Sequence, residues 1–282
     1  MAAGLPSPVL VAVPHAGRDY PENVLAAMRD PQFSALRLED RMVDLLGREI
    51  ARLTGASLLV ASAPRAMIDL NRSLTDMDWT MVAQGAPGGT VNSAANRRAR
   101  SGLGLVPRRL SGLGEIWRTR LDRDEVDRRI AHIHEPYHAA LKHALDRIRS
   151  RWGAAVLVDL HSMPPLRERH PGDVPAQFVV GDRFGASCDG TISAAAMRYF
   201  GREERRASHN RPYAGEYVLD RHGSPSVGIH ALQLEVCRTL YLQPDMASPS
   251  AHLPAIARLL AGLVRVLGEE AVPAGRWPQA AE

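Results

Sequence analysis

Short apolar runs alternate along this chain with longer segments of helical periodicity, and this alternation restricts the fold more than any other feature. The runs carry few charges, as is typical of strands that are buried on both faces. They are Val9–Val13, Leu58–Ala61, Ala155–Leu160, Gln177–Gly181 and His230–Val236. Helical segments are expected at the stripe from Leu38 to Leu53 and at Glu115–Trp152 (interrupted near Pro136), Ser187–Phe200 and His252–Leu267. We therefore predict an α/β fold with a mixed, mostly parallel sheet flanked by helices on both faces.

The length and composition fit one large domain. The chain has 282 residues, of which 45% are hydrophobic and 23% charged, enough to bury a full core. We predict a single domain over residues 1–282, with an ordered core at about 9–268 and a frayed, Pro/Ala-rich tail at 272–282. Segment 79–107 is rich in Gly, Ser and Asn, and it is either a lid over a site or a plain surface loop.

The distribution of charge argues against a nucleic-acid partner. The formal net charge is +4, but the basic residues are almost all arginines, with Lys142 as the single lysine. They alternate with acidic residues, as in Arg118–Arg129, which is typical of a solvated helix face.

Cysteine usage and hydropathy predict a cytoplasmic protein without a membrane partner. Cys188 and Cys237 are few, distant and set in apolar surroundings, so we expect no disulfide framework. No apolar run is long enough to span a bilayer, and the N-terminal residues lack the basic region of a secretory signal. The sequence leaves the oligomeric state open.

Polar residues stand at the carboxyl ends of two of the expected strands. His15 follows Val9–Val13, and His161 follows Ala155–Leu160, while Asp40 precedes an amphipathic helix. Ligands bind at this edge of open α/β sheets. Two histidines and one carboxylate make a catalytic zinc site with an open position for water. The alternative, hydrogen-bonded structural histidines, stays about equally open because the chain has no short HExxH or CxxC spacing.

Three further side chains are candidates for chemistry or binding. Glu235 is the only acid in its apolar run, and it is interpreted as a general base rather than as the partner of a buried arginine. Arg72, preceded by Asn71, and Arg211 lie in segments that Pro and Gly interrupt. Arginine binds carboxylates through two parallel hydrogen bonds, although most arginines in such a chain are surface charges.

Eight sequence blocks carry a resemblance to a known family. In chain order they are PHAGRDYP (14–21), LEDRMVDLL (38–46), PRAMIDLNR (64–72), SGLGLVPR (101–108), HEPYHAAL (134–141), VDLHSMP (158–164), HNRPYAGEYV (209–218) and ALQLEVCRTLY (231–241). Together they resemble the N-formylglutamate amidohydrolase family over about residues 9–245, and that family is in turn similar to zinc carboxypeptidases.

The resemblance implies one Zn²⁺ per chain, with another divalent metal as the alternative. Its ligands would be His15, His161 and an acid of the Glu39–Asp40 pair, with Asp40 preferred. The peptidases place two ligands in an HxxE spacing, whereas this chain has Arg18 at the last position of that frame.

The resemblance also implies roles around the metal. Glu235 would be the general base, Arg72 would hold the substrate carboxylate, and Asn71 and Arg211 would lie nearby. Asp159 is expected to orient His161. The chain departs from the family where a second glycine is expected before Tyr217, because it has Glu216 there.

The implied activity is hydrolysis of the N-formyl or similar N-acyl amide of a small acidic amino acid. For N-formyl-L-glutamate the products would be formate and L-glutamate, a reaction of amino-acid catabolism and of histidine degradation in particular. Two alternatives stay open. One is a zinc carboxypeptidase or amidase that acts on a peptide or another acyl-amino acid. The other is a metal-free binding protein that holds an acidic metabolite with arginines alone.

Overall fold

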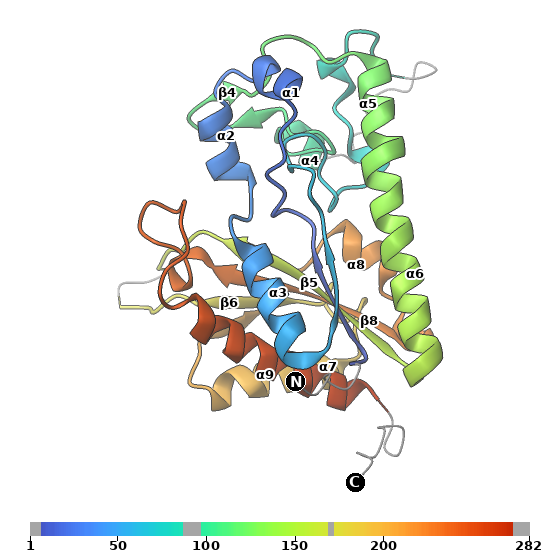
Figure 1. Ribbon diagram of the computed structural model, residues 1–282, viewed down its shortest axis with the longest axis vertical. Helices are drawn as coiled ribbons and strands as arrows, with labels where there is room; N and C mark the ends of the chain where they lie inside the picture. The colour runs from blue at the N-terminus through green and yellow to red at the C-terminus, as the bar shows by residue number, and fades with distance from the viewer. Residues whose placement is uncertain (1–6, 87–96, 169–171, 273–282) are drawn as a thin grey trace. The chain divides into compact units, whose positions relative to one another are not determined.

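The computed structural model describes residues 7–86, 97–168 and 172–272 (Figure 1). These form two compact units. The sheet unit comprises residues 1–13, 41–59 and 141–282, and the loop unit comprises residues 14–40 and 60–140. The single domain over 1–282 stays a prediction, as does a lid at 79–107. Residues 87–96 of that lid and 273–282 of the expected tail lie outside the described residues.

A six-stranded sheet in the order β2-β1-β5-β8-β6-β7 forms the centre of the sheet unit. Its strands are β1 (Val9–Val13), β2 (Ser57–Val60), β5 (Ala155–Met163), β6 (Phe178–Gly181), β7 (Ala207–His209) and β8 (Ile229–Cys237). The pairs β1/β5, β5/β8 and β6/β7 are parallel, whereas β6/β8 is antiparallel. The mixed, mostly parallel sheet is confirmed, and all five expected strands are present. The short strand β7, of three residues, was not among the expected strands.

Helices cover both faces of this sheet. On one face, α3 contacts β1 and β5, and α9 contacts the same strands as well as α3 and α7. Gly47 of α3 lies so close that a Cβ atom there would be 2.9 Å from a methyl group of Val13. The segment leading into α8 crosses the other face, where a Cβ on Gly181 would be 2.6 Å from the carbonyl carbon of Ala214. The helices are α3 (Val43–Thr54), α7 (Gly190–Arg202), α8 (Tyr217–His222) and α9 (Leu253–Ala271).

The loop unit is built from short elements. They are α1 (Glu22–Ala27), α2 (Pro31–Leu38), α4 (Arg97–Arg100), β3 (Arg109–Leu110), β4 (Gly114–Glu115), α5 (Arg123–Arg129) and the start of α6 (Glu135–Trp152). Strands β3 and β4 pair antiparallel. The core of the unit includes Trp117, whose indole N–H donates to the carbonyl oxygen of Pro107 at 2.8 Å.

The long helix expected from Glu115 needs correction. The helix begins only at Arg123, since Glu115 belongs to β4. The interruption is a π-helical segment at Ile130–His134 that joins α5 to α6. Pro136 lies in the first turn of α6, directly after the π-helical segment.

Two expectations about the whole chain can be compared with the structure. Both Cys188 and Cys237 are free and buried, as expected. Across the described ranges, the structure contains no helix with the length and apolar character needed to cross a membrane.

Candidate metal centre and active site

The carboxyl ends of β5 and β8 place four polar side chains on one face of the sheet. Asp159 and His161 lie two residues apart on β5, and Gln233 and Glu235 lie two residues apart on β8. The register pairs Asp159 with Gln233 and His161 with Glu235. Side chains two residues apart on a strand share a face, so these four form two adjacent rows. All four are buried, which is costly for polar groups unless they are paired or functional.

Within each row, a hydrogen bond joins the two side chains. His161 places Nε2 2.8 Å from Oδ2 of Asp159, as was expected. A carboxylate only accepts, so Nε2 carries the proton and Nδ1 is the nitrogen that could ligate a metal. On β8, the amide nitrogen of Gln233 donates to Oε1 of Glu235 at 2.9 Å. This contact holds the carboxylate of Glu235 directly across from His161.

His15 of the loop unit also directs its Nε2 toward an aspartate, but these two residues do not lie on one strand. Its Nε2 lies 2.8 Å from Oδ1 of Asp69, and its Nδ1 lies 3.6 Å from Oδ2 of Asp40. The backbone N–H of Asp40 donates to the carbonyl oxygen of His15 at 2.9 Å, which fixes the two residues side by side. The separation of 3.6 Å is too long for a hydrogen bond.

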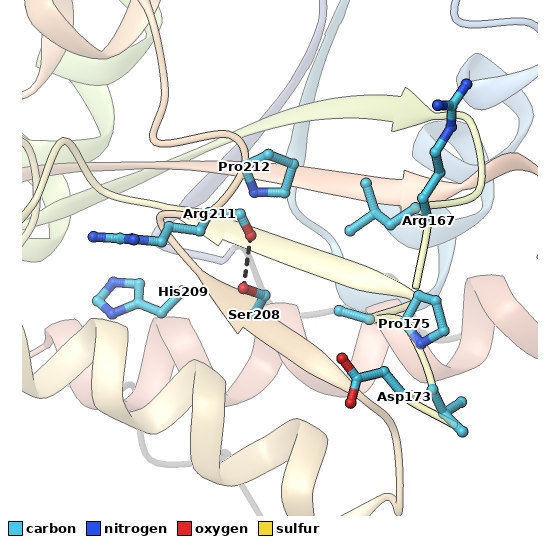
Figure 2. A pocket seen from close by; sticks show the side chains of 10 residues that line it. Arg167, Asp173, Pro175, Ser208, His209, Arg211 and Pro212 are labelled. Atoms are coloured by element: carbon cyan, nitrogen blue, oxygen red, sulfur yellow. Dashed lines mark hydrogen bonds between the residues drawn. The ribbon is translucent and has the colours of Figure 1, made fainter. Parts of the chain in front are cut away.

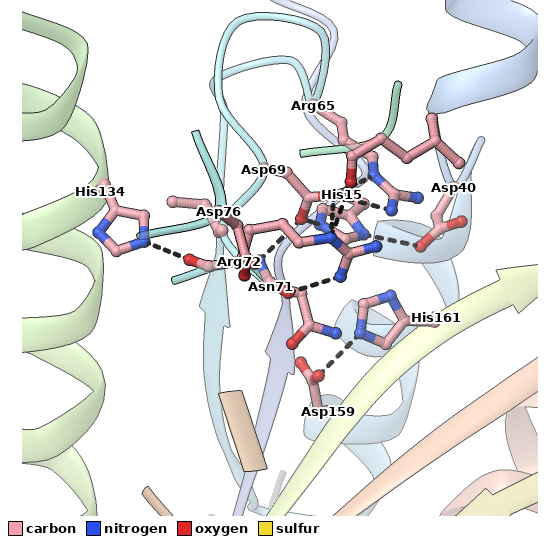
Figure 3. A network of polar contacts seen from close by, with 12 residues as sticks. His15, Asp40, Arg65, Asp69, Asn71, Arg72, Asp76, His134, Asp159 and His161 are labelled. Carbon is pink, nitrogen blue, oxygen red and sulfur yellow. Dashed lines mark hydrogen bonds and ion pairs between the residues drawn. The ribbon is translucent and has the colours of Figure 1, made fainter. Parts of the chain in front are cut away.

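Asp69 is the centre of the polar network around His15 (Figure 3). It is fully buried and accepts hydrogen bonds from Nε of Arg65 at 2.9 Å and from the backbone N–H of Asn71 at 2.8 Å. Burial by itself raises the pKa of Asp69, but the charges of Arg65, His15 and Arg72 outweigh it and hold that pKa well below its usual range. Asp69 is therefore a carboxylate at neutral pH and orients His15.

Arg72 and Asn71 lie in the turn that follows Asp69. Arg72 is buried, and its guanidinium donates to the carbonyl oxygens of Asn71 at 2.7 Å and Leu103 at 3.0 Å. Two residues farther along, Leu105 is bonded through its carbonyl oxygen to the N–H of Asp69. Segment 101–107 is thus tied to the turn that carries Arg72.

Arg211 has a more open environment in the sheet unit. It is exposed and lines a pocket of about 440 Å³ (Figure 2). In the figure its guanidinium lies beside His209, while the side chain of Arg167 points away from it. Two residues after Arg211, Tyr213 packs on the apolar cluster that contains Met163.

Among the residues proposed from the sequence, the structure groups four in the loop unit and two in the sheet unit. The first group is His15, Asp40, Asn71 and Arg72, and the second is His161 and Glu235. His15, Asp40 and His161 are all buried.

Two residues of these networks were not singled out from the sequence. Asp69 stands in the DLNR block, but its contact with His15 joins residues 54 positions apart. Gln233 could have been found, because Gln233-x-Glu235 has the same period of two as Asp159-x-His161.

Residues 7–242 match the N-formylglutamate amidohydrolase family. The chain belongs to this family. It is 30% identical to an N-formylglutamate deformylase of Pseudomonas putida, over 86% of this chain and 88% of that protein. It is 28% identical to an N-formylglutamate deformylase of Pseudomonas aeruginosa, over 95% and 94%.

Solved structures agree with this assignment. The crystal structure of N-formylglutamate amidohydrolase from Ralstonia eutropha JMP134 superposes with a TM-score of 0.83 at 29% identity, and 95% of each chain is covered. A gene product of Agrobacterium tumefaciens shares the fold, with a TM-score of 0.59 at 18% identity over 93% of this chain and 91% of that one. The expectation that the chain is an amidohydrolase of this family is confirmed.

Proposed function

We propose that this family member hydrolyses N-formyl-L-glutamate to formate and L-glutamate, with one metal ion held by His15, Asp40 and His161. Zinc is the metal that best suits two imidazoles and one carboxylate in a hydrolase. The observation that carries the proposal is that both histidines direct Nε2 to a buried aspartate, at 2.8 Å each. A histidine that ligates a metal through one nitrogen usually donates its other N–H to such a carboxylate.

The spacing between His15 and Asp40 suits two ligands of one ion. Ligands at 2.0–2.2 Å from a tetrahedral zinc lie about 3.4 Å from each other. Nδ1 of His15 and Oδ2 of Asp40 are 3.6 Å apart, close to that value and longer than a hydrogen bond. The distance supports Asp40 as the acidic ligand.

The strand order supports His161 as the third ligand. Strand β1 runs parallel to β5 and pairs Ala12 with Asp159. The chain therefore leaves β1 at Val13, next to the strand that carries His161, and reaches His15 two residues later. Because the carboxyl ends of parallel strands share one edge of a sheet, this order favours a common ion for the two histidines.

Glu235 is the proton carrier in this proposal. A bound metal ion supplies Lewis acidity, which lowers the pKa of water and polarises the formyl oxygen. Glu235 accepts one proton as water oxygen bonds to the formyl carbon, and it returns this proton to the amide nitrogen as the C–N bond breaks. The second water proton passes from the resulting formic acid to the amine, so the products are formate and glutamate with a protonated amino group, and atoms and charge balance. Its hydrogen bond from Gln233 keeps the acting carboxylate in place.

Arginines hold the substrate in this proposal. Arg72 is buried and donates to two backbone carbonyls, and we assign it to one carboxylate, with Asn71 beside it. Arg211 is exposed and is assigned to the other carboxylate. When both carboxylates of the substrate are held, the formyl group has a fixed position, and a fixed orientation of the reacting group lowers the barrier to reaction.

Formate release from N-formyl-L-glutamate tests the proposal directly. Purified protein is assayed untreated, after a chelator, and after zinc is restored. Release that the chelator abolishes and zinc recovers supports the proposal. A folded protein that holds zinc but releases no formate would favour the peptidase or amidase alternative. A folded protein that binds no metal, and whose affinity for glutamate is unchanged in His15→Ala, would favour the metal-free binding protein.

A further inference from the structure

Two buried histidines, His134 at the end of the π-helical segment and His138 in the first turn of α6, have no role in the proposed reaction. His134 and His138 are completely buried, and their rings lie 4.5 Å apart between centroids. Nε2 of His134 is 2.9 Å from the carbonyl oxygen of Arg72, and Nε2 of His138 is 3.0 Å from that of Leu70. Carbonyl oxygens only accept, so both rings donate through Nε2.

These two contacts enclose the residue pair that is proposed to bind substrate. The carbonyl groups of Leu70 and Arg72 flank Asn71, and the carbonyl oxygen of Asn71 accepts from the guanidinium of Arg72. Each of the three successive carbonyls is therefore bonded to a side chain. A buried carbonyl without a partner costs about 1–3 kcal/mol, so losing either imidazole donor favours a different conformation of the turn.

The π-helical segment explains how one helix reaches along the whole turn. Arg129, at the end of α5, is also buried and donates to the carbonyl oxygen of Met67 at 3.0 Å. In a regular α-helix, positions 129 and 134 would point about 140° apart. The π segment Ile130–His134 brings residues five apart onto one side, because its hydrogen bonds join such residues. His138 follows His134 at the α-helical spacing of four.

We infer that His134 and His138 are positioning residues, which set the orientation of Asn71 and Arg72 by fixing the backbone between them. This inference rests on the proposed function of Arg72 as the group that holds the substrate carboxylate. Both histidines act through the backbone carbonyls of the turn. The ligand group whose binding depends on the two histidines is the carboxylate of the acyl-amino acid.

Four single variants test the inference. His134→Leu and His138→Leu remove the donor but keep an apolar side chain of similar size. His134→Gln keeps an amide N–H at about the position of Nε2. His132→Leu is the matched control, because His132 is exposed in the same π-helical segment. For each variant we would measure KM and kcat, the zinc content, and hydrogen exchange of peptides covering residues 67–72.

The expected result is a rise in KM of about 10- to 100-fold in both variants that lack the donor, with zinc content unchanged. Exchange at residues 67–72 should accelerate in the same two variants and stay at the wild-type rate in His132→Leu. His134→Gln should recover most of the wild-type KM. Combined with Arg72→Lys, His134→Leu should add less than about threefold to KM, because the two changes act on one interaction.

Wild-type KM and exchange in folded His134→Leu and His138→Leu would overturn the inference. If the leucine variants do not fold, His134→Asn replaces them, since its shorter amide does not reach the carbonyl oxygen of Arg72. It is then compared with His134→Gln. Wild-type protein that releases no formate would contradict the proposed function alone. In that case, exchange at residues 67–72 still decides whether the histidines hold the turn.

Discussion

Two histidine–aspartate pairs use the same contact on different backbones. In the sheet unit, Asp159 and His161 are neighbours on one face of β5. In the loop unit, His15 and Asp69 are joined across 54 positions of the chain. The first pair needs only the alternation of a strand, whereas the second needs a network of further donors to Asp69. We conclude that one histidine–aspartate geometry can be supported either locally or by tertiary contacts.

The difference extends to what else each aspartate holds. Asp69 accepts from Arg65 and from the backbone of Asn71, so it joins the proposed metal ligand to the proposed substrate-binding turn. Asp159 has its strand neighbour as its hydrogen-bonding partner in the described part of the chain. Changes at Asp69 should therefore affect stability, metal and substrate together, and changes at Asp159 should affect mainly the metal.

Glu235→Gln should give the largest loss of activity, and it tests the part of the comparison that concerns the sheet unit. Removing a general base lowers kcat by about 10²–10⁴-fold. The amide is nearly isosteric and can still contact Gln233, so we expect zinc content and thermal stability to stay near the wild-type values. Glu203→Gln, an exposed acid-to-amide change in the same unit, is the control. A kcat within threefold of wild type in zinc-loaded Glu235→Gln would remove Glu235 from the mechanism.

Asp69→Asn and Asp159→Asn compare the two pairs directly. Both should weaken zinc binding by about 10- to 100-fold, because each aspartate orients a histidine that is a proposed metal ligand. Asp69→Asn should also lower the free energy of unfolding by about 3 kcal/mol, the lower end for a broken buried ion pair. The lower end applies because the side chain of Arg65 is 21% exposed. Zinc titration and urea unfolding of the metal-free proteins measure the two effects. Equal destabilisation by both variants would contradict the comparison.

The local features of the molecule were predictable from the sequence, and the non-local ones were not. The five longer strands follow from apolar runs, and the pairing of Asp159 with His161 follows from a spacing of two on a strand. Strand β7 has only three residues and no periodicity to detect. The π segment leaves no pattern of its own, so the interruption of the helical segment was expected near Pro136 and not at Ile130–His134.

In the candidate site, too, the local features could be predicted from the sequence and the non-local contacts could not. His15 and His161 were identified because strand ends are visible in a sequence. The contact between Asp69 and His15, and those of His134 and His138 with the turn at Asn71, depend on tertiary packing over 54 to 68 positions. Hydrophobic periodicity does not encode such contacts. The eight blocks contain these residues but do not say what they touch.

Arg72→Ala and Arg211→Ala compare a buried arginine with an exposed one. Losing a charged hydrogen bond of about 1.5–3 kcal/mol should raise KM about 10- to 100-fold in Arg72→Ala. Arg211 is exposed, and exposed ion pairs contribute about 0.2–1 kcal/mol, so KM should rise less than about fivefold in Arg211→Ala. Steady-state kinetics on N-formyl-L-glutamate measures both changes. A larger effect at Arg211 would move the main carboxylate contact to the sheet unit.

Asp182→Asn should give the smallest effect on stability. It shows what the loss of a buried carboxylate costs where no metal ligand is involved. Asp182 accepts from Asn210 at 2.7 Å and contacts Nε2 of His209 at 2.9 Å. Burial raises its pKa, but the nearby Ser193 hydroxyl and the hydrogen bond from Asn210, among other polar groups, outweigh this and lower the pKa below its usual value. A lowered folded-state pKa stabilises the protein above the unfolded pKa, and this stability is lost as pH falls through the folded-state value.

The wild type should therefore exceed Asp182→Asn by about 1.5 kcal/mol in unfolding free energy at pH 7. Since an unfolded aspartate has a pKa of about 3.9, the difference should stay constant down to about pH 4 and shrink at lower pH. Urea unfolding between pH 3 and 7, with and without a chelator, measures this. The chelator should not change the difference, in contrast to any effect of zinc on Asp69→Asn and Asp159→Asn. A difference that is constant to pH 3 would mean that the amide, and not the lost charge, destabilises the variant.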